Sequence, residues 1–275
     1  MKGRPSTPLA GSTETGPGAA QARRKTPLDF ARGERWSSSA GSINPNGRPR
    51  SRRAPPLRFF VTGTDTGVGK TEVSAALLEA MVAQGLRPFA FKPCESGGNA
   101  DSQTLWEAAG SWQKRQAVCL YRFRAPLAPA LAARAERKKV QWRRLLSGFR
   151  ALGDGPGVVE GAGGLFVPLD ERHDVIDLIE ATGLPVVLVA RAGLGTINHT
   201  VLSLDALLAR GLGVAAVVLV QARRGWEPSL PTNRPELERR FPHLPFLGPL
   251  PFSPHAKPRR ALMAKALAPL IASEL

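Results

Sequence analysis

The sequence has only two cysteines, Cys94 and Cys119, among its 275 residues. Two cysteines are too few for a disulfide framework, and their spacing fits no metal-binding pattern. The sequence also has no uncharged apolar run of about 18 residues, the length that a membrane-spanning helix requires. These absences predict a protein with free thiols in a reducing cytoplasm, with no membrane partner.

Acidic residues are scarce near the amino terminus. Residues 1–56 contain eleven Lys and Arg and three acids, so they carry +8 of the formal net charge of +16. They are rich in Gly, Pro, Ser and Arg and have almost no apolar periodicity, so they cannot bury enough surface to fold. We predict a disordered extension over 1–56 and one folded domain over 57–275.

A basic extension can be an electrostatic tail for nucleic acid or a membrane surface, an organelle transit peptide, or a solvated segment without a role. An amphipathic helix, which a transit peptide needs, would be interrupted by Pro5, Pro8, Pro17, Pro27 and Pro45, so the solvated segment is the simplest interpretation. The other +8 is expected to be spread over 219 residues. A nucleic-acid partner is therefore not expected.

From Leu57 onward, short apolar runs alternate with segments of helical periodicity. Strands are predicted at 58–62, 88–91, 157–160, 185–190, 214–220 and 244–247, and helices at 70–84, 101–109, 140–152, 175–182, 196–210 and 257–272. Fully apolar strands that alternate with helices predict an α/β domain with a single parallel sheet and helices on both faces. Ligands bind such a sheet at the carboxyl ends of its strands.

The first predicted strand is followed by GTDTGVGKT, residues 63–71, and then by a helix. Gly67 and Gly69 let backbone N–H groups approach phosphate oxygens, Lys70 reaches the β- and γ-phosphates, and the Thr71 hydroxyl ligates Mg²⁺. This placement predicts a P-loop NTPase-like nucleotide site.

The loop departs from the strict pattern G-x-x-x-x-G-K-[ST], because Thr64 stands where the first glycine belongs and Gly63 comes one residue earlier. Asp65 and Thr66 are polar side chains that a nucleotide site alone does not need.

Charged residues follow two further strands. Lys92 follows the second strand and, with Lys70, can hold a γ-phosphate and an anionic acceptor, although a solvated lysine is the alternative. Glu160 ends the third strand and can hold Mg²⁺ opposite Thr71. Asp101 is either another Mg²⁺ ligand or a helix cap.

Glycines follow the third and fourth strands. Backbone at 161–164 can approach phosphate or substrate closely. The segment 193–199 starts a helix whose N–H groups suit an anion such as a carboxylate. His199 lies one turn inside that helix and is interpreted as structural.

Four motifs in this order, FVTGTDTGVGKT, FKPCESG, VVEGAGGLFVPL and GLPVVLVARAGLGTINHT, resemble the ATP-dependent dethiobiotin synthetases over nearly all of 57–275. The resemblance implies that 7,8-diaminononanoate takes up CO₂ as a carbamate. The carbamate then attacks the γ-phosphate of ATP, and the second amine closes the cyclic urea. It also implies a homodimer whose substrate carboxylate is bound by the partner subunit.

The same resemblance implies roles for individual residues. Lys70 and Lys92 neutralise carbamate and γ-phosphate, and Thr66 and Ser96 hold the nitrogen end of the substrate. The remaining implied contacts are the Mg²⁺ ligands Thr71, Asp101 and Glu160; the ATP-binding residues Gly67, Val68, Gly69, Lys70, Thr71, Asp101, Glu160, Gly161, Ala162, Gly163, Gln221, Pro251, Phe252 and Ser253; and the substrate-carboxylate residues Gly195, Thr196 and Asn198. The family often has Asn where this chain has Gln221.

Three other classes of protein contain a Gly-rich loop of this kind. A glutamine-dependent amide synthase needs a downstream nucleophilic cysteine, and none follows Cys119. A ParA/MinD-like switch ATPase usually has a lysine at the start of the loop, where this chain has Gly63 and Thr64, although the basic extension suits such a protein. A GTP-binding switch needs an N-K-x-D motif after the fifth strand, which is absent.

Overall fold

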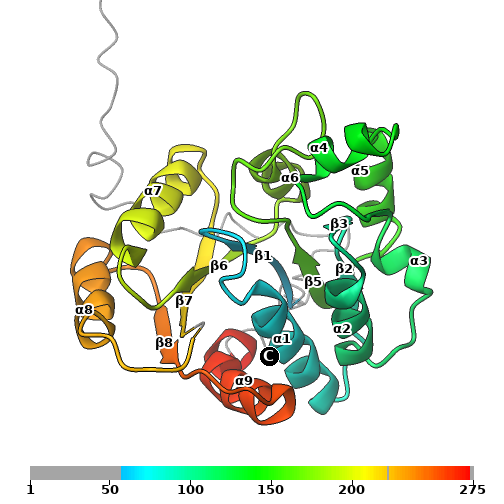
Figure 1. Cartoon of the computed structure of the whole chain (residues 1–275). Helices are drawn as coiled ribbons and strands as arrows, with labels where there is room; N and C mark the ends of the chain where they lie inside the picture. Colours follow the sequence, from blue (N-terminus) through cyan, green and yellow to red (C-terminus); the bar gives the residue numbers. More distant parts are fainter. Residues whose placement is uncertain (1–56, 222, 273–275) are drawn as a thin grey trace, which may run out of the picture. The chain divides into compact units, whose positions relative to one another are not determined.

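The computed structural model describes residues 57–221 and 223–272. The predicted disordered extension, residues 1–56, lies outside the described residues. Figure 1 shows the described elements, which in chain order are β1 (Arg58–Gly63), α1 (Lys70–Ala83), β2 (Phe89–Phe91), β3 (Cys94–Ser96), α2 (Ala100–Ala108), α3 (Arg115–Val118), β4 (Tyr121–Phe123), α4 (Pro129–Ala135), α5 (Trp142–Arg150), β5 (Gly157–Glu160), α6 (Val175–Thr182), β6 (Val186–Arg191), α7 (Thr196–Ala209), β7 (Val214–Val220), α8 (Leu230–Arg240), β8 (Phe246–Leu250) and α9 (Ala256–Ala272). None of the helices in these ranges combines the length and the apolar content needed to cross a membrane.

Six strands form one parallel sheet in the order β2-β5-β1-β6-β7-β8. The strand that precedes the Gly-rich loop, β1, therefore lies between β5 and β6 in the middle of the sheet. Helices cover both faces, as the fully apolar strands predict, and the α/β fold class is confirmed.

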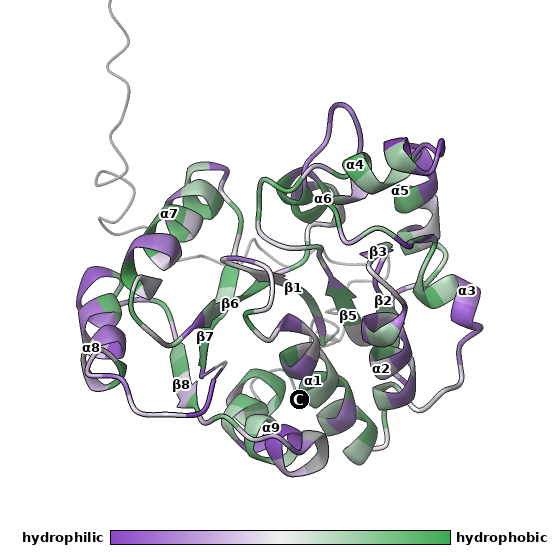
Figure 2. Cartoon of the chain, viewed as in Figure 1, coloured by the Kyte–Doolittle hydropathy of each residue, from purple (hydrophilic) through white to green (hydrophobic). Residues whose placement is uncertain are grey.

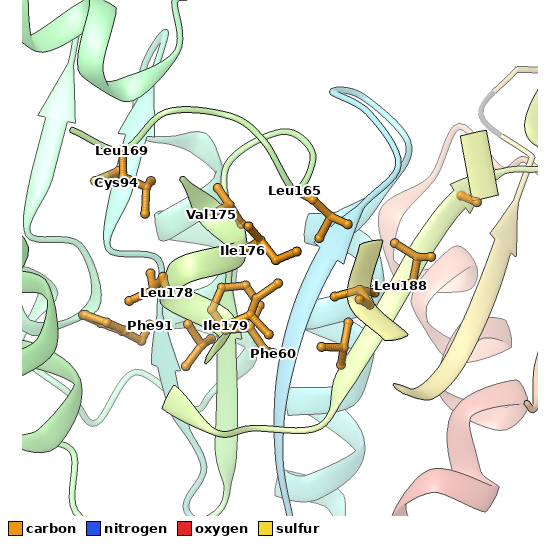
Figure 3. Packing of buried hydrophobic residues seen from close by; sticks show 14 of the residues in the cluster. Phe60, Phe91, Cys94, Leu165, Leu169, Val175, Ile176, Leu178, Ile179 and Leu188 are labelled. Atoms are coloured by element: carbon orange, nitrogen blue, oxygen red, sulfur yellow. The ribbon is translucent and has the colours of Figure 1, made fainter. Parts of the chain in front are cut away.

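Alternate residues of each strand enter two separate cores. Phe60 belongs to the core that includes residues of α4, α5, α6, α7 and α8 on one face, whereas Phe59 and Val61 belong to the core that includes residues of α1, α2 and α9 on the other. Figure 3 shows the first core, where Ile176 and Ile179 of α6 lie over Phe60 of β1. The interior positions of the central strands are hydrophobic, because both faces of the sheet are buried, whereas polar residues such as Arg58, Glu160 and Arg191 stand at strand ends (Figure 2).

The structure adds elements that the apolar pattern does not reveal. The strands β3 and β4 have three residues each and pair only with one another in the described sheets, so neither shows a readable period. Helix α8 contains Pro235 and buries only Asn233 and Leu237, so its sequence is polar nearly all round. The last strand is Phe246–Leu250 rather than 244–247.

The positive charge of residues 57–275 is not spread evenly, and that expectation is wrong. Residues 114–150 contain eleven Lys and Arg and one acid, Glu136, which is a net charge of +10. The rest of 57–275 therefore carries −2, which is +8 minus +10. All eleven basic residues are exposed on α3, β4, α4, α5 and their connections. The surplus charge of these residues thus comes from a surface segment and not from the candidate site.

Helix α6 begins with a capping box that links it to the loop after α7. Asp177 accepts a hydrogen bond from the backbone N–H of Asp174 at 2.7 Å and one from Arg210 Nη1 at 2.6 Å. Burial alone would raise the pKa of Asp177, but these hydrogen bonds outweigh burial and lower it. A carboxyl group with a lowered pKa stabilises the fold above its ordinary pKa, and this contribution decreases as the pH falls through the native pKa.

Replacing Asp177 with alanine is expected to lower the free energy of unfolding by about 1 kcal/mol at pH 7, because it removes the hydrogen bonds of Asp177 to the N-cap backbone and to Arg210. The difference between parent and variant should decrease below pH 3.8, the ordinary pKa of aspartate. Urea unfolding at several pH values measures it. Glu180→Ala, which removes only a 3.4 Å contact to Arg210, should cost less than about 0.5 kcal/mol. A difference that grows on acidification would contradict the lowered pKa.

Candidate active site

The Gly-rich loop connects β1 to α1, and the side chain of Lys70 at the start of α1 points back toward the loop. Gly67 and Gly69 have φ angles of 72° and 102°, which side chains other than glycine rarely adopt. Lys70 Nζ donates to the backbone oxygen of Asp65 at 2.9 Å. The loop therefore has strand, turn and helix in the predicted order, and its lysine points into the turn.

Four side chains meet beside this loop. Lys92 Nζ lies 2.6 Å from Glu160 Oε1 and 3.0 Å from Asp101 Oδ2, and the Thr71 hydroxyl donates to Glu160 Oε1 at 3.0 Å. Because β2 and β5 are neighbours in the sheet, Lys92 and Glu160 leave the same edge side by side. We call Thr71, Lys92, Asp101 and Glu160 the ion-pair cluster.

The pKa values of the two lysines are shifted in opposite directions. Burial alone would lower the pKa of Lys92, but the two carboxylates beside it outweigh burial and raise that pKa. Burial lowers the pKa of Lys70 to about 8, and Glu160 only partly opposes the shift. Lys92 is thus a fixed cation, whereas Lys70 has no equally close carboxylate among the described residues and is suited to an incoming anion.

The pKa of Asp101 is lowered, because the attraction of Lys92 outweighs the effect of burial. Asp101 does not cap α2. Its carboxylate contacts Lys92, and the first N–H groups of the helix are bound by another side chain, Glu95. Of the two interpretations open from sequence, the geometry favours the Mg²⁺ ligand over the cap.

The donor set fits a magnesium ion. Glu160 is fully buried, and its Oε2 has no hydrogen-bond partner among the described residues. An unpaired carboxylate oxygen beside Asp101 and the Thr71 hydroxyl provides the hard oxygen ligands that Mg²⁺ prefers, with phosphate oxygens and water as the others. The described residues contain no group of three His, Cys, Asp or Glu that could hold a metal ion.

Thr66 and Ser96 differ in their surroundings. Thr66 is exposed, and a β-carbon built on Gly163 would lie 3.3 Å from its hydroxyl, so the loop after β5 faces it. The Oγ of Ser96 is buried and has no partner in the described part of the chain. An unpaired buried hydroxyl is costly, so Ser96 suits a polar ligand group.

The predicted adenine residues meet at the ends of β7 and β8. The backbone N–H of Gln221 donates to Leu250 O at 2.9 Å, which places Gln221 beside 251–253. Its side-chain amide donates to the backbone oxygen of Gly225. Pro251 is exposed, and Phe252 and Ser253 are half-buried. A β-carbon on Gly69 would lie 3.2 Å from Val220, so this edge adjoins the Gly-rich loop.

The structure does not bring the start of α7 into this group. Among the described residues, no hydrogen bond or ion pair joins 195–198 to the ion-pair cluster. Gly195 has a φ of 91°, Thr196 is buried and bonds Thr200, and Asn198 is exposed. His199 is also exposed, and within the described ranges no hydrogen bond of its side chain supports a catalytic role.

Sequence reasoning missed Glu95, which is buried and bonds the first N–H groups of α2. The available signal was a glutamate between two predicted site residues, Lys92 and Ser96. Both cysteines are free, as predicted. Both are also buried, and burial raises the pKa of each thiol, that of Cys119 to about 11.

Comparison with known proteins places the chain in a family. Residues 58–260 match a family model described as an AAA domain. The chain is 48% identical over 216 residues to the ATP-dependent dethiobiotin synthetase BioD of Anaeromyxobacter dehalogenans strain 2CP-C, which covers 76% of this chain and 96% of that protein. It is 46% identical over 223 residues to BioD of strain 2CP-1, covering 79% and 98%. The biotin biosynthesis bifunctional protein BioCD of Bordetella avium is 46% identical over 196 residues, covering 71% of this chain and 40% of that protein.

Proposed function

The chain belongs to the ATP-dependent dethiobiotin synthetase family, and from this premise we propose how its residues carry out the reaction. It is an ATP-dependent ligase of biotin biosynthesis. The substrates are 7,8-diaminononanoate, CO₂ and ATP. One amine of diaminononanoate forms a carbamate with CO₂, a carbamate oxygen attacks the γ-phosphorus, and ADP leaves. The second amine then attacks the carbamate carbon, closes the ureido ring and releases phosphate.

The observation that carries this proposal is the position of Lys92 between Asp101 and Glu160, close to the Gly-rich loop. Lys92 binds the carbamate and the transferring phosphoryl group, whose negative charges would otherwise repel each other. Lys70 binds the β- and γ-phosphate oxygens together with the backbone N–H groups of 67–71. In this arrangement the two lysines approach the γ-phosphate from the ends of different strands.

Magnesium is held by Thr71, Asp101 and Glu160 in this proposal. When bound, Mg²⁺ offsets the charge of the phosphate oxygens in the transition state. Glu160 Oε2 offers it an acceptor without a competing partner in the described structure. Backbone at Gly161, Ala162 and Gly163 approaches the phosphates from the β5 side.

Substrate selection involves the unpaired hydroxyl of Ser96 and the exposed hydroxyl of Thr66, which bind the nitrogen end of diaminononanoate. Gln221 and the segment Pro251, Phe252 and Ser253 hold the adenine. Gln221 reaches the base only if its amide leaves the oxygen of Gly225.

We also propose a homodimer in which Gly195, Thr196 and Asn198 bind the carboxylate of a substrate held by the partner subunit. Two features support it. The start of α7 makes no hydrogen bond or ion pair with its own ion-pair cluster in the described residues, and Leu194 and Leu202 beside it are 80% and 60% exposed. The cytoplasmic location stays a prediction, which the two free thiols support.

The test is an assay of the full chain with ATP, Mg²⁺, bicarbonate and diaminononanoate. We expect ADP and dethiobiotin to form in equal amounts, and ADP formation to require diaminononanoate. A switch ATPase would release ADP without diaminononanoate, so substrate-independent turnover would favour that class. Bound nucleotide with no dethiobiotin would refute the ligase reaction for this chain.

A further inference from the structure

Glu95 is a buried carboxylate to which the proposed reaction assigns no role. It lies in β3, three residues after Lys92, and is 4% exposed. Its Oε1 accepts a hydrogen bond from the backbone N–H of Asp101 at 2.8 Å, and both of its oxygens accept from the N–H of Ser102 at 3.3 Å. A carboxylate removed from water requires such donors, so these contacts account for its burial.

Through these hydrogen bonds, a side chain of the strand β3 caps helix α2. The first N–H groups of a helix have no partner inside the helix, and a negative charge beside them is favoured by the helix dipole. Within the described structure Asn99, the residue before α2, makes no capping bond with its side chain. Glu95 therefore supplies the cap that the local sequence does not.

The capped turn carries Asp101 to the ion-pair cluster. The backbone N–H of Asp101 is held by Glu95, while its carboxylate lies 3.0 Å from Lys92 Nζ. Between Glu95 and Asp101 the chain reverses through Gly97 and Gly98, whose φ angles are 84° and 143°. The hydrogen bonds thus close the loop 95–102, which begins at Glu95 and contains Ser96.

We infer that Glu95 is a positioning residue. It fixes the first turn of α2 so that the carboxylate of Asp101 is aimed at Lys92 and at the magnesium position. This inference rests on the proposed function, because that proposal makes Asp101 a metal ligand. The hydrogen bonds of Glu95 to α2 do not depend on the proposed function.

The experiment compares Glu95→Ala with Glu95→Gln in the full chain. Glutamine keeps an acceptor oxygen for the N–H groups of Asp101 and Ser102, whereas alanine removes it. For Glu95→Ala we expect the magnesium concentration that half-saturates ADP binding to rise by about 10- to 100-fold, the usual loss when a residue that orients a metal ligand is removed. Amide hydrogen exchange at Asp101 and Ser102, measured without ligand, should be faster in this variant. Glu95→Gln should stay within about threefold of the parent, because one hydrogen bond to a neutral acceptor differs little in net free energy.

The matched control is Glu107→Ala, at the exposed end of the same helix, where the glutamate contacts only Gln103 among the described residues. It should leave both measurements unchanged. If Glu95→Ala speeds exchange but leaves the magnesium requirement unaltered, Glu95 is merely structural and the inference is overturned. A Glu95→Gln variant as defective as Glu95→Ala overturns it as well.

Two further provisions keep the outcome decisive. If Glu95→Ala does not fold, Glu95→Asp, which is one methylene shorter and withdraws the acceptor, takes its place with the same expected results. Hydrogen exchange needs no substrate. A parent enzyme that forms no dethiobiotin would therefore reject the proposed function, while the effect of Glu95 on α2 is still measured.

Discussion

Replacing Lys92 with glutamine is expected to lower the turnover of diaminononanoate by at least about 10²-fold, the scale of losing one charge-stabilising donor in a transition state. Glutamine can still donate to Glu160, but it carries no charge for the carbamate and the γ-phosphate. The affinity for ADP should change by less than about fivefold, because Lys70 and the backbone of 67–71 provide the contacts to the β-phosphate. Steady-state ADP formation and a titration with ADP measure the two quantities separately.

The control for this variant is Lys139→Gln, which removes an exposed lysine of the positively charged surface segment 114–150. It should leave turnover unaltered. Lys92→Gln also leaves the buried charge of Glu160 without its main partner, and such a change destabilises a fold by about 3–5 kcal/mol. Binding of ADP in the titration would show that the variant is folded. Normal turnover by a folded Lys92→Gln protein would exclude Lys92 as a catalytic residue.

Replacing Glu160 with glutamine should have an effect of similar size, at least about 10²-fold on turnover, because it removes a metal ligand and releases the two side chains that it orients. Glu160 contacts both Lys92 and Thr71 through one oxygen. Without its charge the pKa of Lys92 should fall, since Glu160 is the main group that raises it. Turnover measured over a range of magnesium concentrations should show little recovery.

Asp154→Asn is the matched control, because Asp154 is fully exposed and contacts only Arg58, at 3.5 Å, in the described structure. Its effect on turnover and on the magnesium requirement should be negligible. If high magnesium restores Glu160→Gln to the rate of the parent, Glu160 contributes metal affinity alone. In that case its proposed role in orienting Lys92 is wrong.

Much of the fold could be predicted from the sequence because both faces of the sheet are buried. A strand such as β6 is apolar at every position except its last, and this pattern alternates with helical periodicity along the chain. The exceptions have the same physical cause. The short strands β3 and β4 and the polar helix α8 bury too few residues to leave a pattern, so only tertiary contacts define them.

The candidate site divides in a similar way. Sequence alone determined which residues follow the strands, because the order of apolar runs and glycines fixes where each strand ends. It predicted Lys70, Lys92 and Glu160 as site residues. It could not decide whether Asp101 is a metal ligand or a helix cap.

Only the tertiary structure decided which of these charged groups form ion pairs with one another. Glu160 at the end of β5 is far in the chain from Lys92, which follows β2, and from Asp101 in α2, and the distances among the three follow from the strand order and from the capping of α2 by Glu95. The sequence determined the phosphate loop, since adjacent residues build it. The ion pairs beside it depend on packing between distant segments, which no local pattern encodes.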